Sequence, residues 1–186
     1  FTITVTATND PPTISAITTQ TINEDATTAA LAFTVGDVES AAGNLTLTGG
    51  SSNTNLAPTA NIVFGGSGAN RTVTVTPAAN QSGTSTITVT VSDGGLTAST
   101  SFVLTVNAVN DAPSFTKGTN QTVQEDAGAQ TVANWATNVS AGPGDESGQT
   151  VTFQVSNDNN PLFSAQPSLS SAGTLTYTPA ADKSRQ

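Results

Sequence analysis

The sequence predicts an all-β fold made of tandem β-sandwiches. Threonine alternates with isoleucine, valine or leucine in several segments, such as residues 71–76 and 86–91. A period of two places the aliphatic side chains on one face of a strand and threonine on the other, and β-branched residues favour strands. No segment carries an apolar stripe with the 3.6-residue period of a helix. Sequence motifs also return after about a hundred residues, which indicates repeated modules.

The internal repeat has a constant spacing. Asn9-Asp10-Pro11-Pro12 returns as Asn110-Asp111-Ala112-Pro113, and Asn23-Glu24-Asp25-Ala26 returns as Gln124-Glu125-Asp126-Ala127, both 101 positions further on. The alternating segment Phe1-Thr-Ile-Thr-Val5 matches Phe102-Val-Leu-Thr-Val106 at the same spacing, and Thr76-Pro-Ala-Ala-Asn80 returns as Thr178-Pro-Ala-Ala-Asp182. One module is therefore about a hundred residues long.

Seven strands are expected in the complete module. Each is a run of β-branched or aliphatic residues, and glycine-containing turn signals separate the runs, at Gly49-Gly50, Gly65-Gly66, Gly83 and Asp93-Gly94-Gly95. In the order A to G, the expected strands lie near residues 13–22, 29–35, 44–48, 61–64, 71–76, 84–92 and 97–107. Seven strands in about a hundred residues is the count of an immunoglobulin-like sandwich.

Three parts of the chain follow from the repeat. Residues 1–8 are expected to be the final strand of a preceding repeat, and residues 9–109 one complete β-sandwich repeat. Residues 110–186 are expected to form a second, C-terminally truncated sandwich, which repeats strands A to E and stops before F and G. The sequence thus reads as a window on a tandem array.

The composition excludes several classes of function. The 186 residues include no His and no Cys, which removes disulfides, zinc thiolate sites, thiol nucleophiles and the usual general base. Four Lys+Arg against 13 Asp+Glu give a formal net charge of -9, which disfavours nucleic acids and anionic membranes as partners. The apolar runs are far shorter than the roughly 20 residues needed to span a bilayer. An enzyme is not expected, and hard cations are the natural partners.

Most of the acidic residues fall at the predicted module junctions. Asp10 lies in the linker before the first module, Asp37 and Glu39 follow strand B, and Asp93 lies in the F–G turn, so all four are expected at one end of the sandwich. At the opposite end, Glu24 lies in the A–B loop, beside the next linker with Asn110 and Asp111. Asp145 and Glu146 occupy the B–C loop of the second module.

Clustered carboxylates need a countercharge. Two unit charges 5 Å apart repel by about 3 kcal/mol at an effective dielectric constant of 20, and four basic residues cannot neutralise the acids of this chain. Ca²⁺ binds six to eight oxygens from carboxylates, amides and backbone carbonyls, and needs neither nitrogen nor sulfur. The sequence has no EF-hand loop, so a site must be assembled from separate loops. Solvated turn residues remain the alternative, because Asp-Gly and Asn-Asp-Pro sequences favour turns without any ion.

The motifs together resemble a known family. The Val-Asn-Asp-Ala-Pro linker at 109–113, the Asn-Glu-Asp and Gln-Glu-Asp segments, the Thr-Pro-Ala-Ala run and Val-Ser-Asp-Gly at 91–94 are similar to the cadherin-like, immunoglobulin-like repeats of large bacterial surface proteins and adhesins. The resemblance spans the whole chain. It implies tandem seven-stranded immunoglobulin/cadherin-like β-sandwiches that bind Ca²⁺ at their junctions.

The resemblance also implies a set of metal ligands. They are the linker residues, the B–C loop acids, the F–G loop aspartate and the A-strand glutamate: Asn9, Asp10, Asn110, Asp111, Asp37, Glu39, Asp93, Glu24, Asp145 and Glu146. The sequence departs from the family in two places. The E–F loop, residues 77–83, has no carboxylate, which implies fewer ions per junction. Asp145 and Glu146 are adjacent to each other, and Asp145 lies seven residues later in its module than Asp37 does in the first.

The function expected from these features is mechanical. The chain is expected to be an extracellular, calcium-stiffened structural or adhesion repeat, a spacer in a large bacterial cell-surface protein whose partners are neighbouring repeats of the same polypeptide or fibre. One alternative is a carbohydrate-binding module that uses Trp135 and exposed loops to hold a cell-surface or polysaccharide ligand, although a lone Trp beside strand B more often anchors a core or a junction. A second alternative is a filament subunit assembled by donor-strand complementation, in which residues 1–8 complete the truncated module of another chain.

Overall fold

A computed structural model describes residues 1–184. The chain divides into two compact units, Phe1–Val109 and Asn110–Gln186. Within residues 1–184 the secondary structure consists of strands and short 3₁₀ helices, with no α-helix. This confirms the predicted all-β fold class. The described part of the chain also contains no helix long and apolar enough to cross a membrane.

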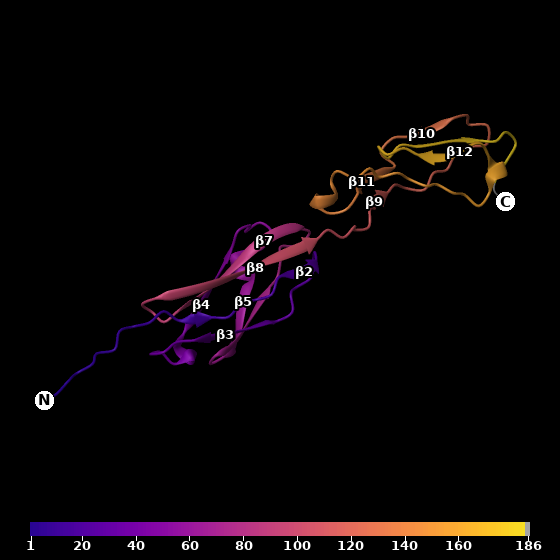
Figure 1. Cartoon of the computed structure of the whole chain (residues 1–186). Coiled ribbons are helices and arrows are strands. Elements are labelled where there is room, and N and C mark those ends of the chain that lie inside the picture. The colour runs from indigo at the N-terminus through magenta and orange to yellow at the C-terminus, as the bar shows by residue number, and fades with distance from the viewer. Residues whose placement is uncertain (185–186) are drawn as a thin grey trace. The chain divides into compact units, whose positions relative to one another are not determined.

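The first unit is a sandwich of two four-stranded sheets (Figure 1). One sheet has the order β1-β3-β6-β5 and the other β2-β8-β7-β4. The strands are β1 (Thr13–Ile14), β2 (Gln20–Asn23), β3 (Leu31–Gly36), β4 (Thr46–Ser51), β5 (Ile62–Ser67), β6 (Asn70–Val75), β7 (Gly83–Ser92) and β8 (Thr97–Asn107), with 3₁₀ helices at Ala42–Asn44 and Thr59–Asn61. All pairs are antiparallel except β2 with β8, which run parallel.

The alternating pattern fills the core of the first unit. Ile87, Val89 and Val91 of β7 are fully buried, and Phe102, Leu104 and Val106 of β8 are at most 3% exposed. They pack with apolar residues of the opposite sheet, including Val73 and Val75 of β6. Burial of such side chains is the main driving force for folding.

Two expectations for the first unit need correction. The segment expected as one strand A is divided, because β1 pairs with β3 in one sheet and β2 pairs with β8 in the other, so the unit has eight strands. Gly49-Gly50 and Gly65-Gly66, expected to be turns, lie inside β4 and β5. A Cβ atom on Gly49 would lie 2.7 Å from Ile62 Cγ2, so this glycine lets β4 approach a core side chain of β5.

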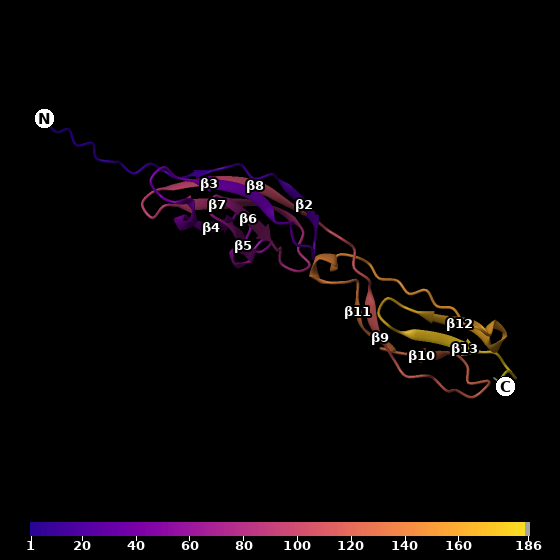
Figure 2. The same ribbon diagram turned by 90° about the horizontal axis from the view of Figure 1, so that it is seen from below.

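The second unit contains fewer strands. A three-stranded sheet has the order β10-β13-β12 (Figures 1 and 2), and β9 pairs with β11. The strands are β9 (Ser114–Lys117), β10 (Gln130–Val132), β11 (Ala136–Ser140), β12 (Phe163–Leu169) and β13 (Leu175–Pro179), with 3₁₀ helices η3 (Gly144–Glu146) and η4 (Asn160–Leu162). Ala136 and Tyr177 are the buried apolar residues found in its described part.

Strand C does not form in the second unit, contrary to the expectation that strands A to E are repeated. No strand lies between β11 and β12 in the described chain. In the first unit, strand C is β4, and its only ladder partner is β7, which is strand F. The described second unit has no strand after β13. Within residues 110–184, the segment that corresponds to strand C is paired with no strand.

Candidate cation-binding ends of the two units

One end of the first unit brings the preceding linker against two loops. The side-chain amide of Asn9 donates a 2.8 Å hydrogen bond to Asp93 Oδ2 in the β7–β8 turn. The backbone N–H of Asp10 donates to Glu39 Oε2, at 3.2 Å. Residues far apart in the sequence thus meet at this end, as the order of the strands predicts.

The Asp93 carboxylate organises the β7–β8 turn. Its Oδ1 accepts hydrogen bonds from the N–H groups of Gly95 (2.6 Å) and Leu96 (2.7 Å). The N–H of Leu96, the side-chain amide of Asn9 and the N–H of Gly95 hold the pKa of Asp93 below its ordinary value, because donated hydrogen bonds favour the charged form. These hydrogen bonds therefore stabilise the charged form of Asp93.

Asp37 shapes the loop that carries Glu39. Its Oδ1 accepts hydrogen bonds from the backbone N–H groups of Glu39 (3.0 Å) and Ser40 (2.6 Å). Its Oδ2 is buried and has no hydrogen-bond partner. One oxygen of Asp37 thus fixes the loop, and the other is left as an acceptor without a donor.

Glu24 lies at the opposite end of the first unit. It directly follows β2, and its backbone N–H donates to the carbonyl of Asn107 at the end of β8, at 2.9 Å. Its side chain is only 6% exposed, and its Oε1 accepts a 2.5 Å hydrogen bond from the N–H of Val109. Glu24 Oε2 is buried without a partner. The side chain therefore holds the last residue of the unit and keeps one free carboxylate oxygen.

Glu146 of the second unit also holds a linker residue by a hydrogen bond to its backbone N–H. It lies in η3, is 4% exposed, and its Oε1 accepts a 2.5 Å hydrogen bond from the N–H of Asp111. Its Oε2 is buried without a partner. A Cβ atom on Gly142 would overlap this oxygen, so the glycine makes room for the carboxylate. The bond repeats the one between Asp10 and Glu39, although Glu146 lies six residues later in its module than Glu39 does.

The remaining predicted ligands are placed differently. Asn110 accepts a 2.9 Å hydrogen bond at Oδ1 from the side-chain amide of Gln149 and donates from Nδ2 to the carbonyl of Asp111. Asp145 is exposed. Gln149 was not anticipated, because no pattern in the sequence marks it as a partner of the linker.

The structure also explains a motif that the sequence singled out. Asp25 and Asn80 both have a positive φ, 59° and 54°, and Asp25 Oδ1 accepts a 3.0 Å hydrogen bond from the N–H of Asn80. Asp126 and Asp182 repeat this arrangement in the second unit, with a 3.3 Å bond and φ values of 63° and 53°. The Glu-Asp-Ala and Thr-Pro-Ala-Ala motifs are therefore the two halves of one loop contact.

The residues at these ends fit a hard cation in part. Among residues 1–184, no three Asp, Glu, His or Cys side chains gather into a group that could hold a metal by themselves. However, Glu24 and Glu146 each bury a carboxylate oxygen that has no donor, and an unpaired buried charge is costly. Ca²⁺ accepts amide and backbone oxygens beside carboxylates. The amide oxygen of Asn110, which accepts a hydrogen bond from Gln149, is an acceptor of this kind.

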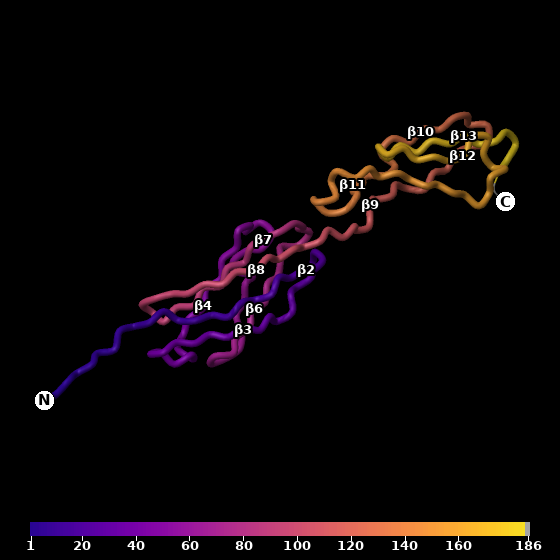
Figure 3. Tube along the Cα trace, in the orientation of Figure 1, coloured from indigo at the N-terminus to yellow at the C-terminus, as the bar shows by residue number. Residues whose placement is uncertain are grey.

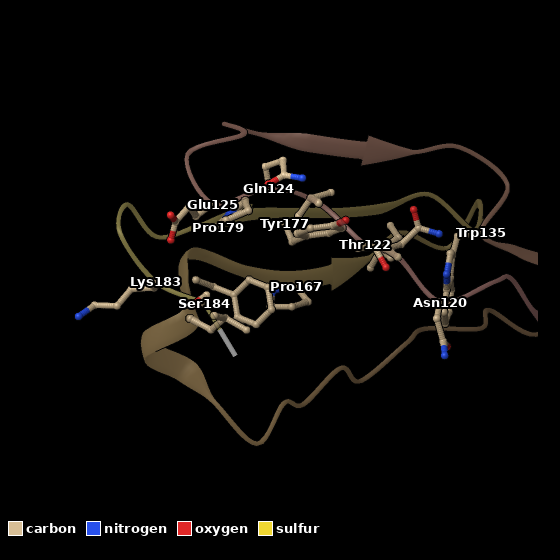
Figure 4. Close-up of a pocket in the computed structure, with 15 residues that line it drawn as sticks. Asn120, Thr122, Gln124, Glu125, Trp135, Pro167, Tyr177, Pro179, Lys183 and Ser184 are labelled. Carbon is tan, nitrogen blue, oxygen red and sulfur yellow. The ribbon is translucent and has the colours of Figure 1, made fainter. Parts of the chain in front are cut away.

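Trp135 lies apart from these ends. It follows β10, at the break between β10 and β11, and its indole N–H donates a 2.9 Å hydrogen bond to the carbonyl of Thr119. It lines a cavity of about 670 Å³ on the second unit, together with Phe163 and Tyr177 (Figure 4). Figure 4 shows Tyr177 in the middle of this cavity and Trp135 at one end.

Comparison with known proteins identifies solved structures that are similar to this chain and a family whose profile it matches. Solved structures similar to this chain include the titin M10–obscurin-like 1 Ig complex, with a TM-score of 0.40 and 16% identity over 54% of this chain and 98% of that chain. Domains 4 and 5 of the S-layer protein SbsC are similar with a TM-score of 0.36 and 22% identity, over 51% of this chain and 53% of that chain. The titin domains z1z2 in complex with telethonin are similar with a TM-score of 0.41 and 12% identity, over 95% of this chain and 85% of that chain. No curated protein matches the chain.

The family assignment rests on the first unit. The sequence profile described as bacterial Ig domain matches residues 9–106, which is more than half of the chain and coincides with the two-sheet sandwich. The strand order β1-β3-β6-β5 against β2-β8-β7-β4 is that of an immunoglobulin fold with a divided first strand. The chain belongs to the bacterial Ig domain family.

Proposed function

We propose that this chain is a calcium-stiffened structural repeat, which serves as a spacer in an extracellular bacterial surface protein. The single observation that carries the calcium part is the pair of buried, unpartnered carboxylate oxygens on Glu24 and Glu146. Each belongs to a side chain whose other oxygen holds the linker, at Val109 and at Asp111 respectively.

The proposed ligands are the acids and amides of the linkers and loops. Glu24, Asn110, Asp111 and Glu146 would serve the linker between the units, with Asp145 as a further carboxylate. Asn9, Asp10, Asp37, Glu39 and Asp93 would serve the end of the first unit that carries the preceding linker. A bound Ca²⁺ neutralises clustered carboxylates and draws their oxygens into one coordination shell.

Stiffness follows from how the linker is held. Glu24 and Glu146 each fix one linker residue by a hydrogen bond to its backbone N–H. Ordering Asn110, which lies between these two linker residues, would restrict bending. A short linker otherwise permits such bending when the domains it joins share little surface. Extracellular modules bind Ca²⁺ with dissociation constants of about 10⁻⁴–10⁻³ M, so the linker would be flexible in the cytosol and ordered outside the cell.

Membership of a family of immunoglobulin-like domains supports a structural role. The absence of histidine and cysteine from the whole chain removes the most common catalytic side chains. We therefore assign no enzymatic activity to the chain. Its proposed place is the bacterial cell surface.

Thermal unfolding of the whole chain in Ca²⁺ and in EGTA tests the proposal. At 10 mM Ca²⁺, dissociation constants of about 10⁻⁴–10⁻³ M predict a gain of about 1.4–2.7 kcal/mol for one site. Small-angle scattering should show a narrower distribution of particle dimensions with Ca²⁺ than with EGTA. Identical melting and scattering curves would eliminate the calcium role and leave a passive repeat.

Two substitutions sharpen the test. Glu24→Gln keeps an acceptor for the N–H of Val109 but removes the charge, and it should reduce the Ca²⁺-dependent rise in melting temperature. Glu125→Gln is the matched control, because Glu125 occupies the same motif position in the second unit but is exposed. A calcium response that Glu125→Gln reduces as much as Glu24→Gln would show that the acidic charge acts nonspecifically.

A further inference from the structure

One edge of the first unit lacks the features that keep an edge strand from pairing with another chain. β5 (Ile62–Ser67) ends the sheet β1-β3-β6-β5, and β6, which lies beside β3 in Figure 3, is its ladder partner. Natural edge strands are commonly short, charged, interrupted by proline or bulged. β5 has six residues, all paired with β6 without a register shift, and contains neither a charged residue nor a proline. Its outer edge is therefore open to a further strand.

Other edge strands of the chain do carry such features. β1 has two residues and directly follows Pro11-Pro12. β12 is an edge of the sheet β10-β13-β12 and contains Pro167, which lies 101 positions after Gly66 of β5. Proline cannot donate a ladder hydrogen bond. The second unit thus has a protective residue at the position where β5 has glycine.

The register of β5 shows which of its backbone groups are free. The N–H of Thr76 donates a 3.2 Å hydrogen bond to the carbonyl of Asn61, just before β5 begins. Because bonded pairs alternate along an antiparallel ladder, every second residue from Asn61 onward bonds to β6 in the same way. Phe64 and Gly66 fall between those residues. Their N–H and C=O groups therefore point away from β6, towards the open edge.

The side of the first unit around this edge is uncharged. Residues 40–70, which include β4 and β5, contain no Asp, Glu, Lys or Arg. β4 is an edge of the other sheet, and it lies against β5, since a Cβ atom on Gly49 would contact Ile62. Two copies with a formal net charge of -9 repel each other. None of that charge lies in residues 40–70, so two copies can approach through this side with the least repulsion.

We propose that β5 pairs with β5 of a second copy of this chain, antiparallel, about a two-fold axis at Gly65. Phe64 of each copy then lies opposite Gly66 of the other, so the outward N–H and C=O groups of both residues gain partners. Val63 of each copy lies opposite Ser67 of the other. The two four-stranded sheets become one continuous sheet across the dimer. This association is separate from the proposed calcium sites, which lie at the ends of the units.

A second copy is the occupant that this edge suits. Two-fold pairing is isologous, so the donors and acceptors of one copy meet the same groups of the other. A foreign strand is selected by pockets for its alternate side chains, but Phe64 is followed by Gly65-Gly66-Ser67, which has small side chains or none. A single strand pair is a small interface, so we expect the association to be weak and to appear at high protein concentration.

Sedimentation equilibrium of the whole chain in EGTA tests the proposal without any contribution from calcium. We expect a monomer–dimer equilibrium that ends at the dimer, because a two-fold interface is closed. Val63 is 59% exposed, and Val63→Lys should lower the association constant by about tenfold or more, since lysine on an edge strand opposes pairing.

Ala32→Lys is the matched control. Ala32 is also exposed and belongs to the same sheet, but it lies in β3, which β6 separates from β5. It adds the same charge and should leave the association constant unchanged. Circular dichroism melting of both variants verifies that they are folded.

Engineered cysteines test the register. The chain contains no Cys, so a mixture of Val63→Cys and Ser67→Cys chains forms disulfides only through the introduced residues. Residues opposite each other in a non-hydrogen-bonded antiparallel pair have Cα atoms about 4.5 Å apart, which suits a disulfide. We expect a cross-linked heterodimer from the mixture and much less cross-linking from Val63→Cys alone.

Several results would overturn the proposal. They are a chain that stays monomeric at every soluble concentration, an association that Val63→Lys leaves intact, or one that Ala32→Lys weakens as much. Dimers that Thr48→Lys disrupts and Val63→Lys does not would place the interface on β4 instead. Val63→Cys chains that cross-link with each other as readily as with Ser67→Cys chains would contradict the two-fold register. The calcium proposal is untouched by any of these outcomes, because every measurement is made in EGTA.

Discussion

Glu24 and Val109 are joined by a 2.5 Å hydrogen bond from the backbone N–H of Val109 to Glu24 Oε1, although 85 positions separate them in the sequence. The parallel pairing of β2 with β8 brings them together, because Glu24 follows β2 and Val109 lies just beyond β8. The bond fixes the point at which the chain leaves the first unit.

Removal of the Glu24 side chain should weaken the first unit. Glu24→Ala leaves the N–H of Val109 without its charged acceptor, and we expect a loss of about 1–2 kcal/mol in the free energy of unfolding, measured in EGTA by urea titration. Glu24→Gln should lose less, because the amide oxygen can still accept the bond and no charge remains buried. Equal losses in the two variants would show that the charge, and not the acceptor, stabilises this end.

The contact between Asp25 and Asn80 makes a second prediction. Asp25 has a φ of 59° and accepts a hydrogen bond from the N–H of Asn80. Asp25→Ala loses the bond and places a Cβ atom in the left-handed region without the local hydrogen bonding that favours Asp there. We expect Asp25→Ala to lower the free energy of unfolding by about 1–2 kcal/mol.

A glycine separates the two effects at this position. Asp25→Gly also loses the hydrogen bond but adopts a positive φ without a steric cost. It should therefore be more stable than Asp25→Ala in the same urea titration. If the two variants unfold together, backbone strain contributes nothing at this loop.

Neighbouring glycines of β4 should respond differently to alanine. A Cβ atom at position 49 would lie 2.7 Å from Ile62 Cγ2, whereas one at position 50 would have Thr88 Cβ as its nearest neighbour, at 3.9 Å. Gly49→Ala should destabilise the first unit by about 1–3 kcal/mol through overpacking. Gly50→Ala should be neutral or slightly stabilising, because alanine restricts the unfolded chain. Thermal unfolding followed by circular dichroism checks both, and a stable Gly49→Ala would show that the two sheets can move apart.

Acid should remove the contribution of Asp93. Hydrogen bonds from Leu96, Asn9 and Gly95 lower the pKa of this carboxyl in the folded state. The contribution is therefore present above the unfolded-state pKa and is lost as the pH falls through the folded-state pKa. The difference in melting temperature between the natural chain and Asp93→Asn should be largest near neutral pH and shrink in acid. A difference that stays constant over the whole pH range would contradict this assignment.

The repeat spacing accounts for how much of the site was predictable. The spacing shows that Asp10 corresponds to Asp111 and that Glu24 corresponds to Glu125, but it cannot show that Glu24 is buried and Glu125 is exposed. Glu24 is buried where its carboxylate accepts a hydrogen bond from Val109, just beyond the end of β8. Glu146 was predicted as a loop acid from its position after strand B, whereas its bond to Asp111 depends on η3 and on the space beside Gly142.

The sequence by itself determined the all-β class, the repeat and the positions of the main strands, because a period of two and a fixed spacing are properties of the chain alone. Only the tertiary structure decided which strands pair with which. β2 and β4 form ladders in the first unit because β8 and β7 lie beside them. A strand is completed by hydrogen bonds to a neighbour, so local pattern cannot specify it without the partner that pairs with it.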